Sequence, residues 1–203
     1  MVRPNFPTDT QAWQNDINGQ WEQGAKFLYG SGNDADRIIF WSRFPLLLMA
    51  VALGWLLFAW TRKRFNTTTA LLVLMFYAFS PTVLAHSRYV TTDIGAMFGF
   101  FIGIAAFLRF LEKPTGKRLL IASIAFAVAQ LLKFSLFLLA PIYILLALMW
   151  AFLQTRENPQ HEGQARVGFL KTFGLLAAKM AAIGLIGLAI IWSVYAWHIW
   201  NYP

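Results

Sequence analysis

The chain has no cysteine among its 203 residues, and only 13% of its residues are charged. Without cysteine there is no disulfide, no thiolate metal ligand and no cysteine nucleophile. Soluble domains are about half apolar and about a quarter charged, whereas this chain is 58% hydrophobic. The shortage of charge excludes an ordinary soluble domain and indicates a polytopic membrane protein.

The few charges are unbalanced, with 17 Lys and Arg against 9 Asp and Glu and a formal net charge of +8. A positive balance is also typical of nucleic-acid-binding proteins. Here, however, the basic residues cluster in short links between apolar runs, which is the positive-inside pattern of membrane proteins. We therefore expect membrane lipid as a partner and no nucleic acid. No cleavable signal sequence is predicted, because residues 1–37 are polar.

Six apolar segments predict an all-α bundle of about six transmembrane helices within residues 38–203. Their expected bounds are 38–60, 68–85, 94–110, 119–132, 136–153 and 172–197. The long apolar run is divided near Lys133, because a single helix over 119–153 would be about 52 Å long, well beyond a ~30 Å hydrocarbon core. Pro81 is expected inside the last turn of the second segment, and residues 154–171 are expected to form a polar loop.

Residues 1–37 are expected to form an extracytoplasmic tail. One face of a helix would carry the apolar residues that recur at steps of four, four and seven, which are Trp13, Ile17, Trp21 and Leu28. This spacing favours an amphipathic helix on the membrane surface, and a frayed solvated tail is the alternative. Asp34 or Asp36 is placed to cap the first span.

The distribution of Lys and Arg over the links predicts the orientation. The links at 61–66, 111–118 and 154–171 each carry three Lys or Arg, whereas the link at 86–93 carries one. The three basic links are therefore expected in the cytoplasm, and residues 86–93 and Lys133 outside it. The expected location is an inner (plasma) membrane.

On this topology the unusual polar side chains gather at the outer surface. They are Arg43, His86, Arg88, Tyr89, Asp93 and Lys133. Ionisable groups at membrane depth are costly and therefore indicate a functional site. Each also has a structural explanation. Asp93 fits a helix N-cap, and Arg43 fits a side chain that reaches the lipid headgroups. Lys133 fits a hairpin tip, and His86 fits a structural histidine.

The chemistry of this set fits transfer at a phosphate. A carboxylate and an imidazole hold a divalent cation or orient an acceptor hydroxyl. The cations Lys133, Arg88 and Arg43 hold a phosphate and stabilise it as it departs. A polyprenyl-phosphate sugar would present such a phosphate at the membrane surface. A transport protein, or one that binds an ion or a lipid, would use the same residues.

Three stretches carry a family resemblance. They are Asp-Ala-Asp-Arg followed by Ser-Arg-Phe-Pro at 42–45, Phe-Ser-Pro-Thr-Val-Leu-Ala-His-Ser-Arg-Tyr-Val-Thr-Thr-Asp at 79–93, and Ala-Gln-Leu-Leu-Lys-Phe-Ser at 129–135. Together they resemble the bacterial dolichyl-phosphate-mannose protein mannosyltransferase-like family, which has the C-type membrane glycosyltransferase fold. The resemblance implies transfer of a sugar, with inversion, from a polyprenyl-phosphate donor to a protein or glycan acceptor on the extracytoplasmic side.

The same resemblance implies roles for individual residues. Asp93 corresponds to the second acidic residue of the site, and Lys133 to a contact of the donor phosphate. We predict that Asp93, His86 and Arg88 are catalytic and that Asp93 is the ligand of a divalent metal. Lys133, Arg43 and Tyr89 are predicted to bind the donor lipid phosphate.

The chain also departs from the family pattern. The family has an acidic motif in its first outer loop, just after a first membrane helix, and neither is present here. The six segments look like helices two to seven of a seven-helix core. We therefore expect a fragment that lacks the first helix and the C-terminal part, as one piece of a split enzyme or as an inactive remnant.

Overall fold

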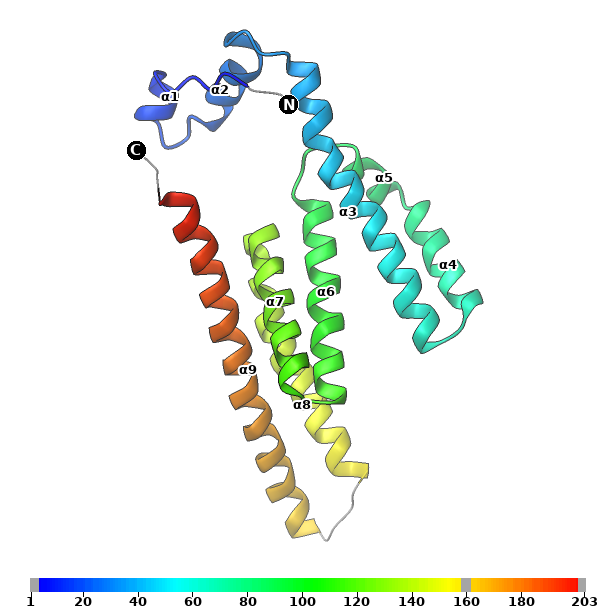
Figure 1. Cartoon of the computed structure of the whole chain (residues 1–203). Helices are drawn as coiled ribbons and strands as arrows, with labels where there is room; N and C mark the ends of the chain where they lie inside the picture. The colour runs from blue at the N-terminus through cyan, green and yellow to red at the C-terminus, as the bar shows by residue number, and fades with distance from the viewer. Residues whose placement is uncertain (1–3, 158–161, 201–203) are drawn as a thin grey trace. The chain divides into compact units, whose positions relative to one another are not determined.

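The computed structural model describes residues 4–157 and 162–200, and all the regular elements among them are helices (Figure 1). They form two compact units, Met1–Thr91 and Thr92–Pro203. The predicted all-α fold is thereby confirmed.

Four of the described helical segments are long and apolar enough to cross a membrane. They are Ala35–Arg64, Asp93–Glu112, Phe134–Gln154 and Phe169–Ile199. A bent helix pair in the first unit, Thr67–Ala78 with Pro81–Ser87, raises the number to five if it forms one span. Helix α7 (Gly116–Leu132) has 17 residues and is not among them. The chain therefore has the helices of an integral membrane protein, while the predicted number of six spans stays a prediction.

The first unit contains a long helix, α3 (Ala35–Arg64), and α4 (Thr67–Ala78), which packs against it. The side chain of Asp34 accepts a hydrogen bond from the backbone N–H of Arg37 at 3.0 Å, so Asp34 is the cap of this helix. The Tyr77 hydroxyl of α4 donates to the carbonyl of Ala50 on α3 at 2.8 Å. This bond satisfies a polar group between two apolar helices and fixes their register.

Pro81 begins a helix instead of lying inside the last turn of one, so its predicted position was wrong. Helix α4 ends at Ala78, and α5 (Pro81–Ser87) follows at an angle of 59°. Ser80 caps α5, because its hydroxyl accepts from the backbone N–H of Val83 at 3.5 Å. Proline has no N–H to donate inside a helix, whereas the first helical position requires none.

The N-terminal residues form short helices connected by turns. They are α1 (Gln11–Gln14), α2 (Gln20–Ala25) and the π-helix η1 (Lys26–Gly30). The single helix predicted on the apolar spacing is interrupted between α1 and α2. In the turn between these helices the backbone of Gly19 packs closely against that of Ala12. A Cβ at position 19 would lie 2.2 Å from the Ala12 carbonyl oxygen, so this packing requires glycine. Ile17 is 96% exposed and Trp21 is 84% exposed.

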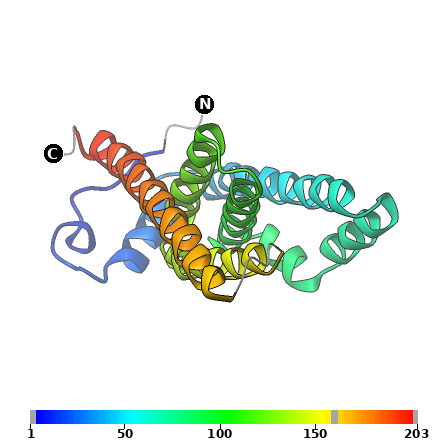
Figure 2. The same cartoon turned by 90° about the horizontal axis from the view of Figure 1, so that it is seen from below.

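The described residues of the second unit form a bundle of four helices. They are α6 (Asp93–Glu112), α7, α8 (Leu139–Glu157) and α9 (Glu162–Ile199). A 3₁₀ turn, η2 (Phe134–Leu138), connects α7 to α8. Helix α7 packs against α6 and α9, and α8 also contacts both of these helices (Figures 1 and 2). Most of the predicted polar loop at 154–171 is helical, and residues 158–161 lie outside the described residues.

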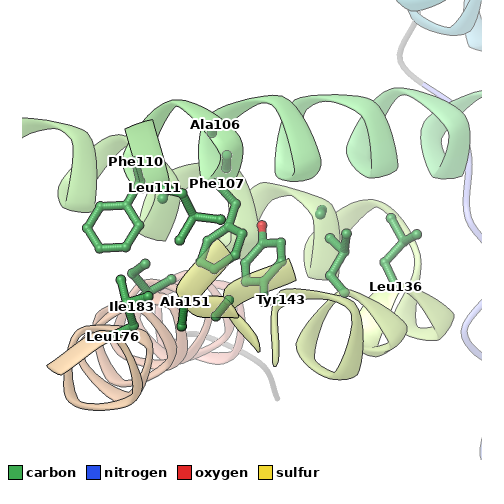
Figure 3. Close-up of a cluster of buried hydrophobic side chains, with 14 residues drawn as sticks. Ala106, Phe107, Phe110, Leu111, Leu136, Tyr143, Ala151, Leu176 and Ile183 are labelled. Carbon is green, nitrogen blue, oxygen red and sulfur yellow. The ribbon is translucent and has the colours of Figure 1, made fainter. Parts of the chain in front are cut away.

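Aromatic and small residues form the core of this bundle. Tyr143 of α8 stacks on Phe107 of α6 with 4.0 Å between ring centroids (Figure 3). The Tyr143 hydroxyl donates to the carbonyl of Gly103 at 2.9 Å, so the one polar atom of this side chain is satisfied inside the bundle. The ring of Phe110 lies beside that of Phe107, at 5.9 Å.

Glycines of α6 bring this helix close to the turn between α7 and α8. A Cβ on Gly99 would lie 2.7 Å from Cδ1 of Leu136 and 3.0 Å from Cα of Ala129. A Cβ on Gly103 would lie 2.8 Å from Cδ1 of Leu139. Larger residues at these positions would push α6 away from the turn. These glycines therefore set how closely α6 approaches the end of α7, η2 and the start of α8.

Candidate functional site

An ion pair joins the ends of two helices in the second unit. The Nζ atom of Lys133 lies 2.9 Å from Oδ1 of Asp93, within hydrogen-bond distance. The Lys133 side chain is 33% exposed and the Asp93 side chain is 41% exposed. The pair is therefore held by the fold and remains accessible to a ligand from solution or from the membrane surface.

Asp93 is the first residue of α6, one position later than the predicted N-cap. The N-cap residue is Thr92, whose side chain makes no capping hydrogen bond. A carboxylate in the first turn is stabilised by the positive end of the helix dipole. The Asp93 carboxylate thus faces both a helix N-terminus and the Lys133 ammonium.

Lys133 follows the last residue of α7 and has an extended backbone, with φ −157° and ψ 126°. Its N–H still donates to the carbonyl of Ala129 at 3.2 Å, so it closes the helix. The predicted division of the apolar run at Lys133 is therefore correct. The chain changes direction at Lys133, and the long Lys133 side chain reaches Asp93 at the start of α6.

The other predicted site residues lie in the first unit. His86 is in the last turn of α5, and its side chain is half-buried. Arg88 is the C-cap residue of α5 and is exposed, and Tyr89 is 57% exposed. Arg43 is exposed on α3, which packs against α5. Among the predicted residues, Asp93 and Lys133 are in direct contact through their ion pair.

Sequence reasoning missed the glycines that position this pair. Gly95, Gly99 and Gly103 recur every four residues and begin two residues after Asp93. This spacing is the small-residue pattern that lets membrane helices approach closely. The signal was present in the sequence, although it does not reveal which helix packs on the glycines.

Comparison with known families gives an independent indication of function. The sequence model of the family described as dolichyl-phosphate-mannose-protein mannosyltransferase matches residues 37–159, more than half of the chain. The chain belongs to this family. It is therefore a membrane glycosyltransferase of the mannosyltransferase type. No curated protein and no solved structure shows a significant match.

The matched segment of this mannosyltransferase-family protein includes all six predicted site residues. It covers the ion pair, the turn between α7 and α8, and the glycines of α6. Helix α9 begins after the match ends. The family assignment thus rests on the same part of the chain that carries the polar groups.

The side chains around Asp93 do not fit a divalent metal by themselves. Divalent cations in proteins are bound by several oxygen or nitrogen ligands. Within residues 4–157 and 162–200, no three His, Asp or Glu side chains lie close enough together to hold a metal ion. The Asp93 carboxylate faces an ammonium group instead. A metal at Asp93 stays a prediction that requires further ligands.

An apolar cavity of about 380 Å³ lies between α7, α8 and α9 of the mannosyltransferase-family chain. Its lining includes Phe126, Tyr143 and Phe173 and is otherwise formed by small and aliphatic side chains. The Tyr143 hydroxyl already donates to Gly103. The cavity therefore presents hydrocarbon surface, which suits a hydrocarbon chain far better than a sugar or a phosphate.

Proposed function

We propose that this family member transfers a sugar from a polyprenyl-phosphate donor to a protein or glycan acceptor on the extracytoplasmic side of a bacterial plasma membrane. The observation that carries the proposal is the accessible ion pair of Asp93 and Lys133 inside the family-matched segment. An ammonium held at a helix end binds a phosphate oxygen by a charge-assisted hydrogen bond.

Each member of the pair has a role in the proposed transfer. The acceptor hydroxyl attacks the anomeric carbon of the donor, the bond to the phosphate oxygen breaks, and the lipid phosphate leaves with the bonding electrons. Lys133 moves from the carboxylate to the phosphate and stabilises its growing negative charge. Asp93, released from the pair, accepts a hydrogen bond from the acceptor hydroxyl, orients it, and takes its proton as the new glycosidic bond forms.

The first-unit residues complete the proposal. We propose that His86 and Arg88 take part in catalysis, and that Arg43 and Tyr89 contact the donor phosphate. Arg88, Tyr89 and Arg43 are exposed, and the half-buried His86 lies two residues before Arg88 in the sequence. Arginine suits a phosphate because its planar guanidinium forms two parallel hydrogen bonds.

The proposed side of transfer gives a labelling prediction. Single cysteines are clean probes because the chain has none of its own. Cysteine at the exposed Ser135, near Lys133, should react with a membrane-impermeant thiol reagent applied to intact cells. Cysteine at Gly116, at the basic opposite end of α7, should react only after the membrane is permeabilised. Labelling of both positions from one side would contradict the proposed orientation.

Protection of Lys133 from chemical modification tests the donor. The purified protein is treated with an amine-acylating reagent with and without polyprenyl phosphate, and the modification rate of Lys133 is read by mass spectrometry. At ten times its Kd the lipid leaves about one tenth of the sites free, so it should slow modification about tenfold. Lys117 is the internal control, because it is exposed at the other end of α7.

Two ligands separate the possible sources of protection. A polyprenol without phosphate should leave the rate unchanged, and inorganic phosphate should protect only at far higher concentration because it lacks the apolar chain. Absence of protection by polyprenyl phosphate would overturn the proposed donor site. Protection in a protein that transfers no sugar would instead favour a lipid-binding or transport protein, or an inactive remnant of the transferase.

A further inference from the structure

The turn that carries Lys133 is tied across its base by one side chain. Gln130, in the last turn of α7, donates from Nε2 to the carbonyl oxygen of Leu136 in η2 at 2.8 Å. The N–H of Leu136 in turn donates to the carbonyl of Lys133 at 3.0 Å. The Gln130 amide therefore connects the residues before and after Lys133 and closes the turn around it.

The same turn is fixed to the helix that carries Asp93. The Leu136 side chain is only 5% exposed, and its Cδ1 atom approaches the backbone of Gly99 on α6. Leu132, the residue before Lys133, lies against Gly95 of the same helix. The hydrogen bond of Gln130 thus acts on a segment that is already packed on α6. The contact on α6 is Gly99, six residues after Asp93 in the sequence.

We infer that Gln130 is a positioning residue, which holds the turn at 133–136 so that the Lys133 ammonium reaches Asp93 and, in the proposed transfer, the donor phosphate. The second part of this inference rests on the proposed function, whereas the first concerns the ion pair alone. Lys133 has an extended backbone and a long flexible side chain. The position of its ammonium group therefore depends on how firmly the backbone of the turn is held.

A purely structural explanation of the hydrogen bond makes a different prediction. A glutamine among apolar helices requires a partner for its amide, and the Leu136 carbonyl is a suitable one. If that were its whole role, loss of the amide would change the stability of the bundle and leave the pairing of Lys133 as it is. The two explanations therefore differ in what happens at the Lys133 amine.

The test measures the acylation rate of Lys133, without any lipid, in four proteins that each contain all 203 residues. They are the wild type, Asp93→Asn, Gln130→Met and the double variant. Methionine keeps the length of the side chain and cannot donate a hydrogen bond. A partly exposed ion pair is worth at most about 1 kcal/mol, so loss of Asp93 should speed acylation by up to about fivefold.

Gln130→Met should speed acylation by a similar factor, and the double variant should be no faster than Asp93→Asn alone. Gln154→Met, the same substitution at an exposed glutamine of α8, is the matched control and should leave the rate unchanged. An unchanged rate in Gln130→Met, or effects that multiply in the double variant, would overturn the inference. If Gln130→Met does not fold, Gln130→Leu takes its place. Failure of both variants to fold would mean that the hydrogen bond serves the stability of the bundle alone, and this result would also overturn the inference.

Binding of polyprenyl phosphate separates this inference from the proposed function. Gln130→Met should weaken that binding by up to about fivefold in the wild-type background and leave it unchanged when Lys133 is alanine. If the acylation rates follow the expected pattern while lipid binding is unaffected in every variant, the donor proposal fails and the positioning of Lys133 by Gln130 stands.

Discussion

A Lys133→Ala variant is expected to bind polyprenyl phosphate about ten to a hundred times more weakly than the wild type. The ammonium removed by this change is the group proposed to hold the phosphate, and a charge-assisted hydrogen bond contributes about 1.5–3 kcal/mol. Lys133→Arg should retain part of the affinity, because the charge remains while the geometry of the donor changes. Affinity is measured by titrating the purified protein in lipid nanodiscs with a short-chain polyprenyl phosphate.

The control for this variant is Lys117→Ala. Lys117 is an exposed lysine on the same helix, at the end opposite to Lys133. Its removal lowers the net charge by the same amount, so any loss of affinity through general electrostatics would appear in both variants. Equal affinity of Lys133→Ala and the wild type for polyprenyl phosphate would show that Lys133 has only a structural role, as a residue at a hairpin tip that pairs with Asp93.

An Asp93→Asn variant of an active preparation should transfer sugar about ten to a hundred times more slowly. The amide keeps the shape of the side chain and loses the negative charge proposed to orient the acceptor hydroxyl. The same variant should bind the bare lipid phosphate up to about fivefold more tightly, because Lys133 no longer has a competing carboxylate. Transfer is measured with radiolabelled polyprenyl-phosphate-mannose in membranes, and binding as for Lys133→Ala.

Folding of this variant should be nearly normal, because the N-cap position belongs to Thr92 and losing the interaction of the carboxylate with the helix dipole costs only about 0.3–1 kcal/mol. Its thermal melting is the control. Normal transfer by Asp93→Asn would leave Asp93 as a structural partner of Lys133. Weaker rather than tighter binding of the bare phosphate would place the carboxylate within the phosphate site, as expected if a bridging cation connected the two.

Much of the fold follows from local sequence signals. The apolar runs predicted α6 and α7 to within three residues at each end, because hydrocarbon imposes both the length and the helical state of a span. Helix α9 begins at Glu162, ten residues before its predicted start, and α4 ends at Ala78, seven residues before its predicted end. Asp34 was identified as a candidate cap, and Lys133 as a break, because both are polar residues at the edge of apolar segments. Such signals depend on neighbours in the chain and require no knowledge of packing.

Contacts between distant residues could not be predicted in this way. Asp93 and Lys133 are 40 residues apart, and each had a separate explanation as a cap and as a hairpin tip. Their contact depends on the close approach of α6 to η2, which the glycines of α6 permit. The position of Pro81 was mispredicted because the apolar composition continues through the bend. The helix boundary there is set by the cap at Ser80, which begins a new helix.

The shortness of α7 has a consequence for the lipids around the bundle. Its 17 residues rise about 26 Å, less than the ~30 Å core of a typical bilayer. If α7 crosses the membrane, as the sequence predicts, this hydrophobic mismatch would be relieved by local thinning of the bilayer, at a cost of fractions of a kcal/mol per Å. The headgroup plane would then lie closer to the Lys133 end of the helix, and a lipid-linked phosphate would lie deeper with it. We therefore expect the acyl-chain length of the host membrane to influence how readily such a lipid meets Lys133.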